Sequence, residues 1–361
     1  MLSRYFSYQQ FEDALKAILK TMGQKSLSDI EIGKSVKDRS IYGIKLGTGK
    51  IKILIWSQMH GNESSTTRAL FKFIKSDDLD SLLRNISLYI IPVLNPDGTE
   101  NWTRLNANNV DLNRDAIDLT QPESRILRSV FDHFNPDYCL NLHGQRSIFG
   151  SLDGDQPAQI SFLAPAGDLE KTISQARLKS MQVINAIHGQ LKNKVNGVIG
   201  RYSDDFNINC VGDYMTSKHV PTVLFEAGHS GDDYSRDRVT DLMYESLKIA
   251  INTIKKGAVI DKYDILDVYN SIPRMNKSYV DILIKNYQSI SGLKTLGVQY
   301  HEQVKEGVLY FVPVLIGINR EDVLYGHREI DLNDFLDYNN DLILEENLEI
   351  RSKSLDIGIF Y

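Results

Sequence analysis

The chain has 361 residues, of which 42% are hydrophobic and 24% charged, and its formal net charge is −6. This length allows one large α/β domain or a main domain with a smaller appendage. The negative charge favours neither a nucleic acid nor a membrane partner, because both prefer basic surfaces, and no apolar run approaches the ~18 residues of a membrane-spanning helix.

The chain begins with a segment of helical period. Residues 1–22 show the apolar spacing of an amphipathic helix, and Glu12 and Asp13 stand where a signal peptide would need an uninterrupted apolar core. We therefore expect a cytoplasmic protein, unless a leader was removed.

Apolar segments then alternate with helical segments. The apolar segments, which indicate buried strands, are 51–57, 87–94, 137–144 and 220–228. The helical segments are 65–74, 122–134, 168–192 and 235–256. Continuous apolar strands separated by helices predict an α/β fold with a mixed, largely parallel twisted sheet, flanked by helices on both faces.

The pattern changes near residue 262. Helical period weakens, and short strands are indicated at 279–286, 296–304, 307–317 and 341–352. We therefore predict an α/β domain at residues 1–260 and a small β-rich C-terminal domain or extension at residues 261–361.

Polar groups follow the predicted strands of the main domain. His60 and Glu63 come after the first strand, Asn95 after the second, and His143 and Glu226 near the ends of the third and fourth. In a parallel sheet, ligands gather at the carboxyl ends of the strands. These side chains are therefore candidates for one site.

His60 and Glu63 are spaced three residues apart, so one turn of chain can direct both at the same ion. Catalytic zinc takes three protein ligands, commonly His and Glu, and His143 supplies a third. A His-x-x-Glu pair also occurs by chance, and Glu63 would favour the start of the following helix. Both interpretations remain open on spacing alone.

The segment 95–115 adds two guanidinium groups and an amide, from Arg104, Arg114 and Asn113. A guanidinium can hold a carboxylate through two parallel hydrogen bonds, or stabilise a negative oxygen beside a metal. The alternative is a solvated loop with surface arginines. Glu226 comes at the end of an apolar strand. Partial desolvation at this position raises the pKa of a carboxyl toward that of a general base. A strand-end salt bridge is the other interpretation.

These motifs share an order and a spacing. HGNE at 60–63, NPDG at 95–98, RLNANNVDLNR at 104–114, LHG at 142–144 and TVLFEAG at 222–228 together resemble the zinc carboxypeptidase family (metallocarboxypeptidases). The resemblance covers roughly residues 28–256. It implies that His60, Glu63 and His143 bind one Zn²⁺ ion, and that Asp111 hydrogen-bonds a zinc-bound histidine and fixes its tautomer.

The resemblance also implies the roles of the other residues. Arg104 would polarise the scissile carbonyl, Asn113 and Arg114 would bind the substrate's terminal carboxylate, and Glu226 would be the base that activates a zinc-bound water. The family's substrate-contacting tyrosine corresponds to Tyr202 or, as second choice, Tyr214.

One position departs from the family pattern, because Asp115 stands where members usually have asparagine, and this would alter the charge of the carboxylate pocket. His229, three residues beyond Glu226, is expected to be structural.

The sequence therefore predicts a zinc metallopeptidase that removes the C-terminal residue of a peptide with a free carboxylate. One alternative is a zinc amidase acting on cell-wall-derived peptides or N-acyl amino acids. Another is a catalytically silent zinc-binding or peptide-binding module. Side-chain specificity and oligomeric state are not indicated by the sequence.

Overall fold

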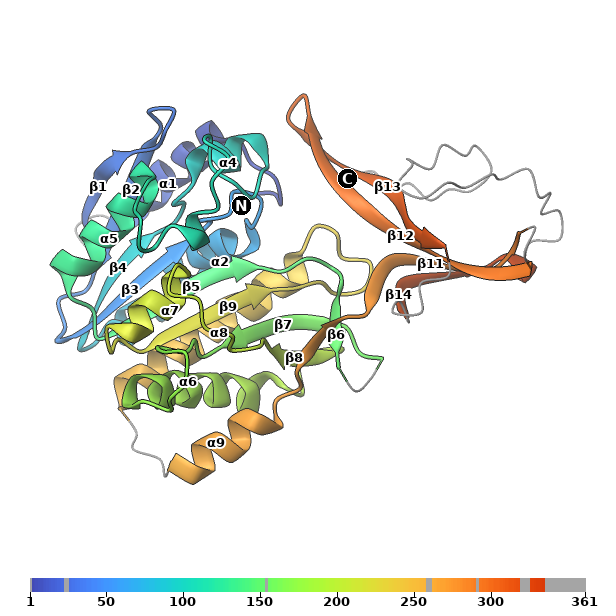
Figure 1. The fold of residues 1–361 in the computed structure, drawn as a ribbon. Helices are drawn as coiled ribbons and strands as arrows, with labels where there is room; N and C mark the ends of the chain where they lie inside the picture. The colour runs from blue at the N-terminus through green and yellow to red at the C-terminus, as the bar shows by residue number, and fades with distance from the viewer. Residues whose placement is uncertain are drawn as a thin grey trace.

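An eight-stranded mixed sheet forms the centre of the molecule (Figure 1). The computed structural model describes residues 2–22, 26–152, 155–257, 262–289, 292–318 and 325–334. The sheet has the order β1-β2-β4-β3-β5-β9-β7-β8. Its strands are β1 (Ser26–Lys34), β2 (Ser40–Leu46), β3 (Ile51–Ser57), β4 (Ile86–Ile91), β5 (Tyr138–Gly144), β7 (Ala158–Leu163), β8 (Val198–Arg201) and β9 (Thr222–Ala227).

The four central strands, β4, β3, β5 and β9, run parallel to one another, whereas β2 and β7 pair with them in the antiparallel sense. The carboxyl ends of the central strands therefore meet at one edge of the sheet. The predicted α/β fold, with a mixed and largely parallel sheet, is confirmed.

The alternation of side chains along β3 shows why both faces of the sheet are covered. Ile53 and Ile55 join the larger apolar core, and Leu54 and Trp56 join the smaller one on the opposite face. Helices with residues in the larger core are α1 (Tyr8–Met22), α2 (Ser65–Ile74), α3 (Leu79–Leu82), α6 (Gln175–Leu191), α8 (Asp237–Lys256) and α9 (Lys262–Ser271). Helices of the smaller core are α5 (Pro122–Phe134) and α7 (Val211–Ser217), and the short α4 (Pro96–Asn101) follows β4.

Two predicted helices begin later than expected. The helix predicted at 168–192 starts at Gln175, because the Ser174 side chain accepts a hydrogen bond from the Arg177 N–H and caps it. The helix predicted at 1–22 starts at Tyr8. The helix α9 was not predicted, and it adds Ile265 and Tyr269 to the larger core. The division of the chain after residue 260 stays a prediction.

The C-terminal part of the chain forms a second sheet, which projects from the main body (Figure 1). It has the order β13-β12-β11-β14, and a short pair, β6 with β10, joins it to the main body. The strands are β6 (Phe149–Ser151), β10 (Met275–Lys277), β11 (Tyr279–Ser289), β12 (Gly292–Lys305), β13 (Val308–Ile318) and β14 (Tyr325–Asp331). The strand predicted at 341–352 lies outside the described residues. Among the helices that the structure describes, none is long and apolar enough to cross a membrane.

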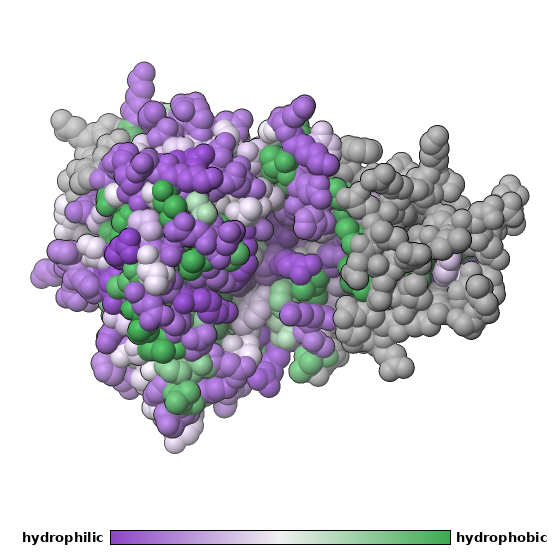
Figure 2. All heavy atoms as spheres, turned by 45° about the horizontal axis from the view of Figure 1, so that its top comes forward, coloured by the Kyte–Doolittle hydropathy of each residue, from purple (hydrophilic) through white to green (hydrophobic). Residues whose placement is uncertain are grey.

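Aromatic side chains join the two sheets. Tyr5, Trp102 and Tyr234 of the main body share an apolar cluster with Leu296 and Phe311 of the second sheet. Figure 2 shows a largely hydrophilic surface with a hollow between the main body and the projecting strands. The main body and the second sheet are therefore packed together and still leave an opening on this face.

Two histidines, the buried His229 and the partly buried His327, pack edge to face at this junction. The rings of His229 and His327 are 4.5 Å apart between centroids, and His327 Nε2 donates a hydrogen bond to the Ser147 carbonyl, 2.7 Å away. Burial lowers the pKa of both histidines, and the charge of Arg236 lowers both further. Both rings are therefore neutral in the folded protein at neutral pH.

The junction should weaken in acid. Because the pKa of His327 is lower in the folded chain than in the unfolded chain, stability is complete above the ordinary pKa and is lost as the pH falls through the folded value. We expect the free energy of unfolding to fall below about pH 6.5 by up to about 1.4 kcal/mol per pH unit for each excluded proton. His327→Gln keeps a donor for Ser147 and should flatten this slope in urea titrations between pH 5 and 8. An equal slope in both proteins would contradict this assignment.

Candidate metal centre

The turn after β3 brings His60 and Glu63 onto one side of the chain. It starts at Gln58, whose backbone is in the left-handed region (φ 46°), and the Gln58 amide donates to the Gly61 carbonyl at 2.8 Å. A Cβ on Gly61 would lie 1.9 Å from the Gly98 carbonyl carbon, so only glycine allows this turn to pack against α4. The glycine of the HGNE motif is thus a steric requirement.

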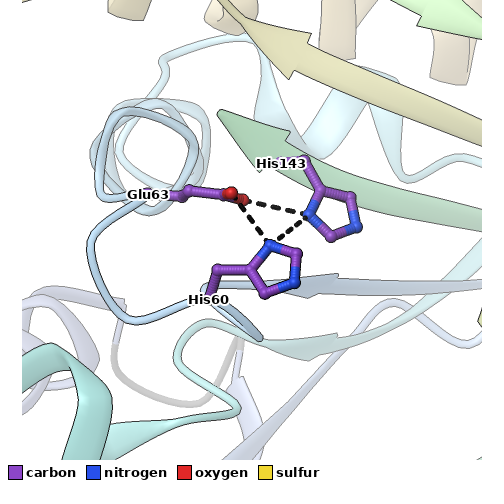
Figure 3. Close-up of side chains that lie close together, drawn as sticks. All are labelled: His60, Glu63 and His143. Carbon is purple, nitrogen blue, oxygen red and sulfur yellow. Dashed lines mark hydrogen bonds and ion pairs between the residues drawn. The ribbon is translucent and has the colours of Figure 1, made fainter. Parts of the chain in front are cut away.

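Three side chains converge at the edge where the parallel strands end (Figure 3). One ligand atom from each of His60, Glu63 and His143 lies within 4.8 Å of the others. His60 Nδ1 is 2.8 Å from Glu63 Oε1, His143 Nδ1 is 3.0 Å from Glu63 Oε2, and the two Nδ1 atoms are 3.2 Å apart. The Gly144 N–H donates to Glu63 Oε2 at 2.9 Å and orients the carboxylate.

Asp111 fixes the proton on His60. Its Oδ1 accepts a hydrogen bond from His60 Nε2 at 2.9 Å, which leaves the Nδ1 lone pair directed at Glu63 and His143. Burial opposes the charge on His60, but the Glu63 and Asp111 carboxylates outweigh it and raise the pKa of His60 to about 9. Burial lowers the pKa of His143. The cluster therefore favours one shared positive charge.

The donor set fits zinc. Two imidazole nitrogens and a carboxylate oxygen are the ligands of an open catalytic zinc site, with a fourth position left for water or substrate. A proton can join only two of the facing acceptors, whereas a divalent cation satisfies all three. Both histidines are 1% exposed, so a cation held here is shielded from competing solvent.

Arg104 adds a second positive charge beside the cluster. Its Nε and Nη2 donate to Asp111 Oδ2 at 3.2 and 3.0 Å, and Nη1 lies 3.4 Å from Glu63 Oε1. The side chain remains 47% exposed. Its guanidinium is thus anchored on one side and accessible to a ligand on the other.

Glu226 stands directly beside His143 in the sheet. The two residues are register partners in the parallel pair of β5 and β9. Among the described residues, Glu226 Oε2 has no hydrogen-bond partner. Burial, followed by repulsion from Glu63, raises the pKa of Glu226 well above its usual range. A carboxyl with a raised pKa and one unpartnered oxygen, beside the three candidate ligands, is suited to accept and release a proton.

Asn113 and Arg114 lie in the short 3₁₀ turn that follows Asp111. Asn113 Oδ1 accepts a hydrogen bond from the Val211 N–H at 2.9 Å, and exposed Arg114 donates to the Asn113 carbonyl at 2.7 Å. Asp115 is 3% exposed, and its carboxylate accepts the Thr120 and Gln121 N–H groups, each at 2.9 Å. Asp115, the residue that differs from the family pattern, therefore closes a turn before α5.

The two candidate tyrosines lie in different surroundings. Tyr202 donates from its hydroxyl to Gln145 Oε1 at 2.7 Å, and burial, then the charges of Glu226 and Glu63, raise its pKa. Tyr214 packs in the smaller core under the guanidinium of Arg128, 3.7 Å from the ring centroid. Tyr202 thus lies within the electrostatic influence of Glu226 and Glu63, whereas the Tyr214 ring lies in the smaller core.

Sequence reasoning missed two residues beside this site. Gln145 follows the LHG motif directly and donates through Nε2 to the Ala158 carbonyl at 3.0 Å. Buried Arg236 donates to the carbonyls of Gln145 and Ala227, at 2.7 and 3.1 Å, and so ties the ends of β5 and β9 together. The position of Gln145 directly after the LHG motif could have indicated that it lies at the site. The sequence around Arg236 gives no such signal.

His229 contacts the junction. Its Nε2 donates to the Gly231 carbonyl at 2.6 Å, and its ring packs on Tyr234 and His327. These contacts agree with the structural role expected for this residue.

Comparisons with known proteins find similarity to zinc carboxypeptidases. The family model for zinc carboxypeptidases matches residues 15–147, which include all the site residues above except Glu226, Tyr202, Tyr214, Arg236 and His229. Carboxypeptidase SOL1 of Arabidopsis thaliana is 30% identical over 164 residues, which cover 39% of this chain and 33% of that protein. Probable carboxypeptidase 2 of Trichophyton verrucosum is 30% identical over 101 residues, 26% of this chain and 19% of that protein.

The match thus spans a third or less of the length of these two curated relatives. Among solved structures, a metallo-carboxypeptidase from Burkholderia cenocepacia superposes with a TM-score of 0.58 at 17% identity, covering 70% of each chain. This likeness shows the fold.

The cluster should bind one zinc ion. We expect His143→Ala to abolish stoichiometric zinc in metal analysis of the purified protein, because it removes one of three ligands. Asp111→Asn should weaken zinc binding by about 10-fold to 100-fold in chelator competition, since outer partners of metal-bound histidines tune affinity by this amount. His133→Gln, at an exposed histidine of α5, is the control and should bind as the wild type does. Full zinc binding by His143→Ala would show that the ion is held elsewhere.

Proposed function

We propose that the chain, which is similar to the zinc carboxypeptidases over residues 15–147, is a zinc-dependent metallocarboxypeptidase. Its substrate is a peptide or peptide-like molecule with a free terminal carboxylate, from which it removes the last residue. The match spans only part of the curated relatives, so activity, substrate and mechanism are all part of the proposal.

One observation carries this proposal: the ligand atoms of His60, Glu63 and His143 lie within 4.8 Å, and Glu226 is the register partner of His143. A binding module needs the ligands alone. A hydrolase also needs a base that reaches the attacking water, and an unpartnered carboxyl beside the ligands supplies one. The pairing therefore favours a hydrolase over a silent module.

In this mechanism His60, Glu63 and His143 hold the zinc ion. When bound, zinc supplies Lewis acidity, which polarises the scissile carbonyl and acidifies water. Glu226 accepts a proton from the attacking water and passes it to the departing amine. Arg104 places its exposed guanidinium edge against the carbonyl oxygen, where negative charge develops.

Asn113 and Arg114 determine which end of the peptide is bound at the site. Arg114 is exposed and presents a guanidinium, the group best suited to a carboxylate, and Asn113 is fixed by the Val211 N–H. A substrate that ends in a carboxylate is thereby held with its last peptide bond near the ligands. Tyr202, whose hydroxyl is held by Gln145, contacts the bound substrate.

The proposal requires that a free carboxylate matters. We expect kcat/KM for a C-terminally free peptide to exceed that of its amidated form by about 100-fold or more, because the amide leaves Arg114 unpaired. Equal turnover of both forms would contradict carboxypeptidase activity and favour the amidase alternative, which cell-wall-derived peptides and N-acyl amino acids would then test.

The base is tested separately. Glu226→Gln should keep one zinc ion per chain and lose about 1,000-fold or more in kcat, since the amide cannot accept the proton. Metal content by elemental analysis is the control measured on the same sample. Turnover at the wild-type rate in Glu226→Gln would refute the role of Glu226.

A further inference from the structure

The segment 145–151 connects the metal cluster to the second sheet. It begins two residues after His143, and its last part is strand β6. In β6, Phe149 pairs with Lys277 and Ser151 with Met275 of β10, and the Ile148 carbonyl accepts the Tyr279 N–H at 3.1 Å. The segment that follows His143 is therefore hydrogen-bonded to the first strands of the C-terminal part of the chain.

Two contacts of the Tyr202 side chain lie on this segment. The hydroxyl donates to Gln145 Oε1 at 2.7 Å, and the ring packs against Phe149 with centroids 5.2 Å apart. The Tyr202 backbone is held as well, because its N–H donates to the Phe162 carbonyl at 3.0 Å. The position of the hydroxyl thus depends on where segment 145–151 lies.

A buried polar network from the second sheet holds the middle of the segment. Gln299 donates through Nε2 to Ser147 Oγ at 2.8 Å and also to the Asp281 carboxylate. His327 donates to the Ser147 carbonyl at 2.7 Å. Ser147, Gln299 and Asp281 are 9%, 5% and 1% exposed, so water does not compete for these bonds.

Asp281 is in turn fixed from two sides. It accepts the Tyr300 N–H at 2.7 Å and the Tyr234 hydroxyl at 2.9 Å. Tyr234 belongs to the main body and Tyr300 to β12 of the second sheet. The network therefore sets the direction of the Gln299 amide as well as its distance from Ser147.

We propose that the second sheet positions the active site, with Gln299 and Asp281 acting through Ser147 to hold the Gln145–Tyr202 hydrogen bond. Gln299 and Asp281 are positioning residues, since neither touches the metal cluster in the contacts above. This inference rests on the proposed function, in which Tyr202 contacts substrate. By this inference the second sheet contributes to turnover, because it positions Tyr202.

A matched pair of serines separates this role from general stability. Ser147→Ala removes the acceptor of Gln299 and the hydrogen bond from Ser147 to Asp281, and it leaves the bond between Gln299 and Asp281 in place. Ser278 lies in the same junction, is 3% exposed, and its hydroxyl has no partner among the described residues. Ser278→Ala is therefore the control, and both variants should keep one zinc ion per chain.

We expect Ser147→Ala to lower kcat/KM for a C-terminally free peptide by about 5-fold, the usual effect of losing one hydrogen bond, here the bond between Gln145 and Tyr202, and Ser278→Ala to leave it unchanged. In a double-mutant cycle, Ser147→Ala should cause no further loss in the Tyr202→Phe background, because the hydroxyl that it positions is gone. Additive losses, or equal losses in the two serine variants, would overturn the proposal.

A measurement without turnover distinguishes this inference from the proposed function. With 3-fluorotyrosine at position 202, the ¹⁹F resonance should shift or broaden in Ser147→Ala and stay as in the wild type in Ser278→Ala. An unchanged resonance in Ser147→Ala overturns the positioning role, whatever the activity. A shifted resonance in a protein that cleaves no peptide keeps the positioning role and refutes the proposed function.

Discussion

Two imidazole nitrogens and a carboxylate oxygen face one another within 4.8 Å, and the rest of the site follows from the need to place a positive charge among them. The parallel register of β3, β5 and β9 sets the separation of the side chains. Gly61 allows the turn that returns Glu63 to the strand edge, and Asp111 turns the lone pair of His60 inward. Each of these devices makes sense only if a cation, or at least a proton, is shared at the centre.

The same constraint explains the charges around the cluster. Arg104 bridges Asp111 and Glu63, so that the negative charge which orients His60 is partly neutralised at the surface. Glu226 Oε2 has no hydrogen-bond partner in the described part of the chain, and burial keeps the pKa of this carboxyl raised. The pKa values of Glu63 and Glu226 thus shift in opposite directions: burial raises both, but His60 and His143 outweigh it at Glu63 and lower its pKa. Environment, and not residue type, divides their roles.

Much of this arrangement could be predicted because it depends on the spacing of apolar residues within short segments. The helices at 65–74 and 122–134 have the bounds that their apolar spacing and, for the second, Pro122 indicate. The convergence of His60, Glu63 and His143 follows from strand ends in a parallel sheet, whatever the length of chain between them. By contrast, the late start of α6 depended on one cap, Ser174, inside a segment that has helical period on both sides.

What could not be predicted are contacts whose partners share no spacing. Gln299 and Ser147 are 152 positions apart, and nothing in either neighbourhood marks the pair. Asp115 looked like a change in a carboxylate pocket, because a motif gives the order of residues and not the direction of their side chains. In the structure its carboxylate turns away to cap the chain before α5.

The junction between the two sheets is more polar than adhesion requires. An apolar contact among Tyr5, Trp102, Leu296 and Phe311 already holds the sheets together, and a buried carboxylate adds a desolvation cost to it. The hydrogen bonds that Asp281 accepts offset this cost and also restrain direction, because hydrogen bonds fix angles as well as distances. That restraint falls on segment 145–151, next to His143 of the candidate metal site. A junction built only for cohesion would have no reason to place its polar groups there.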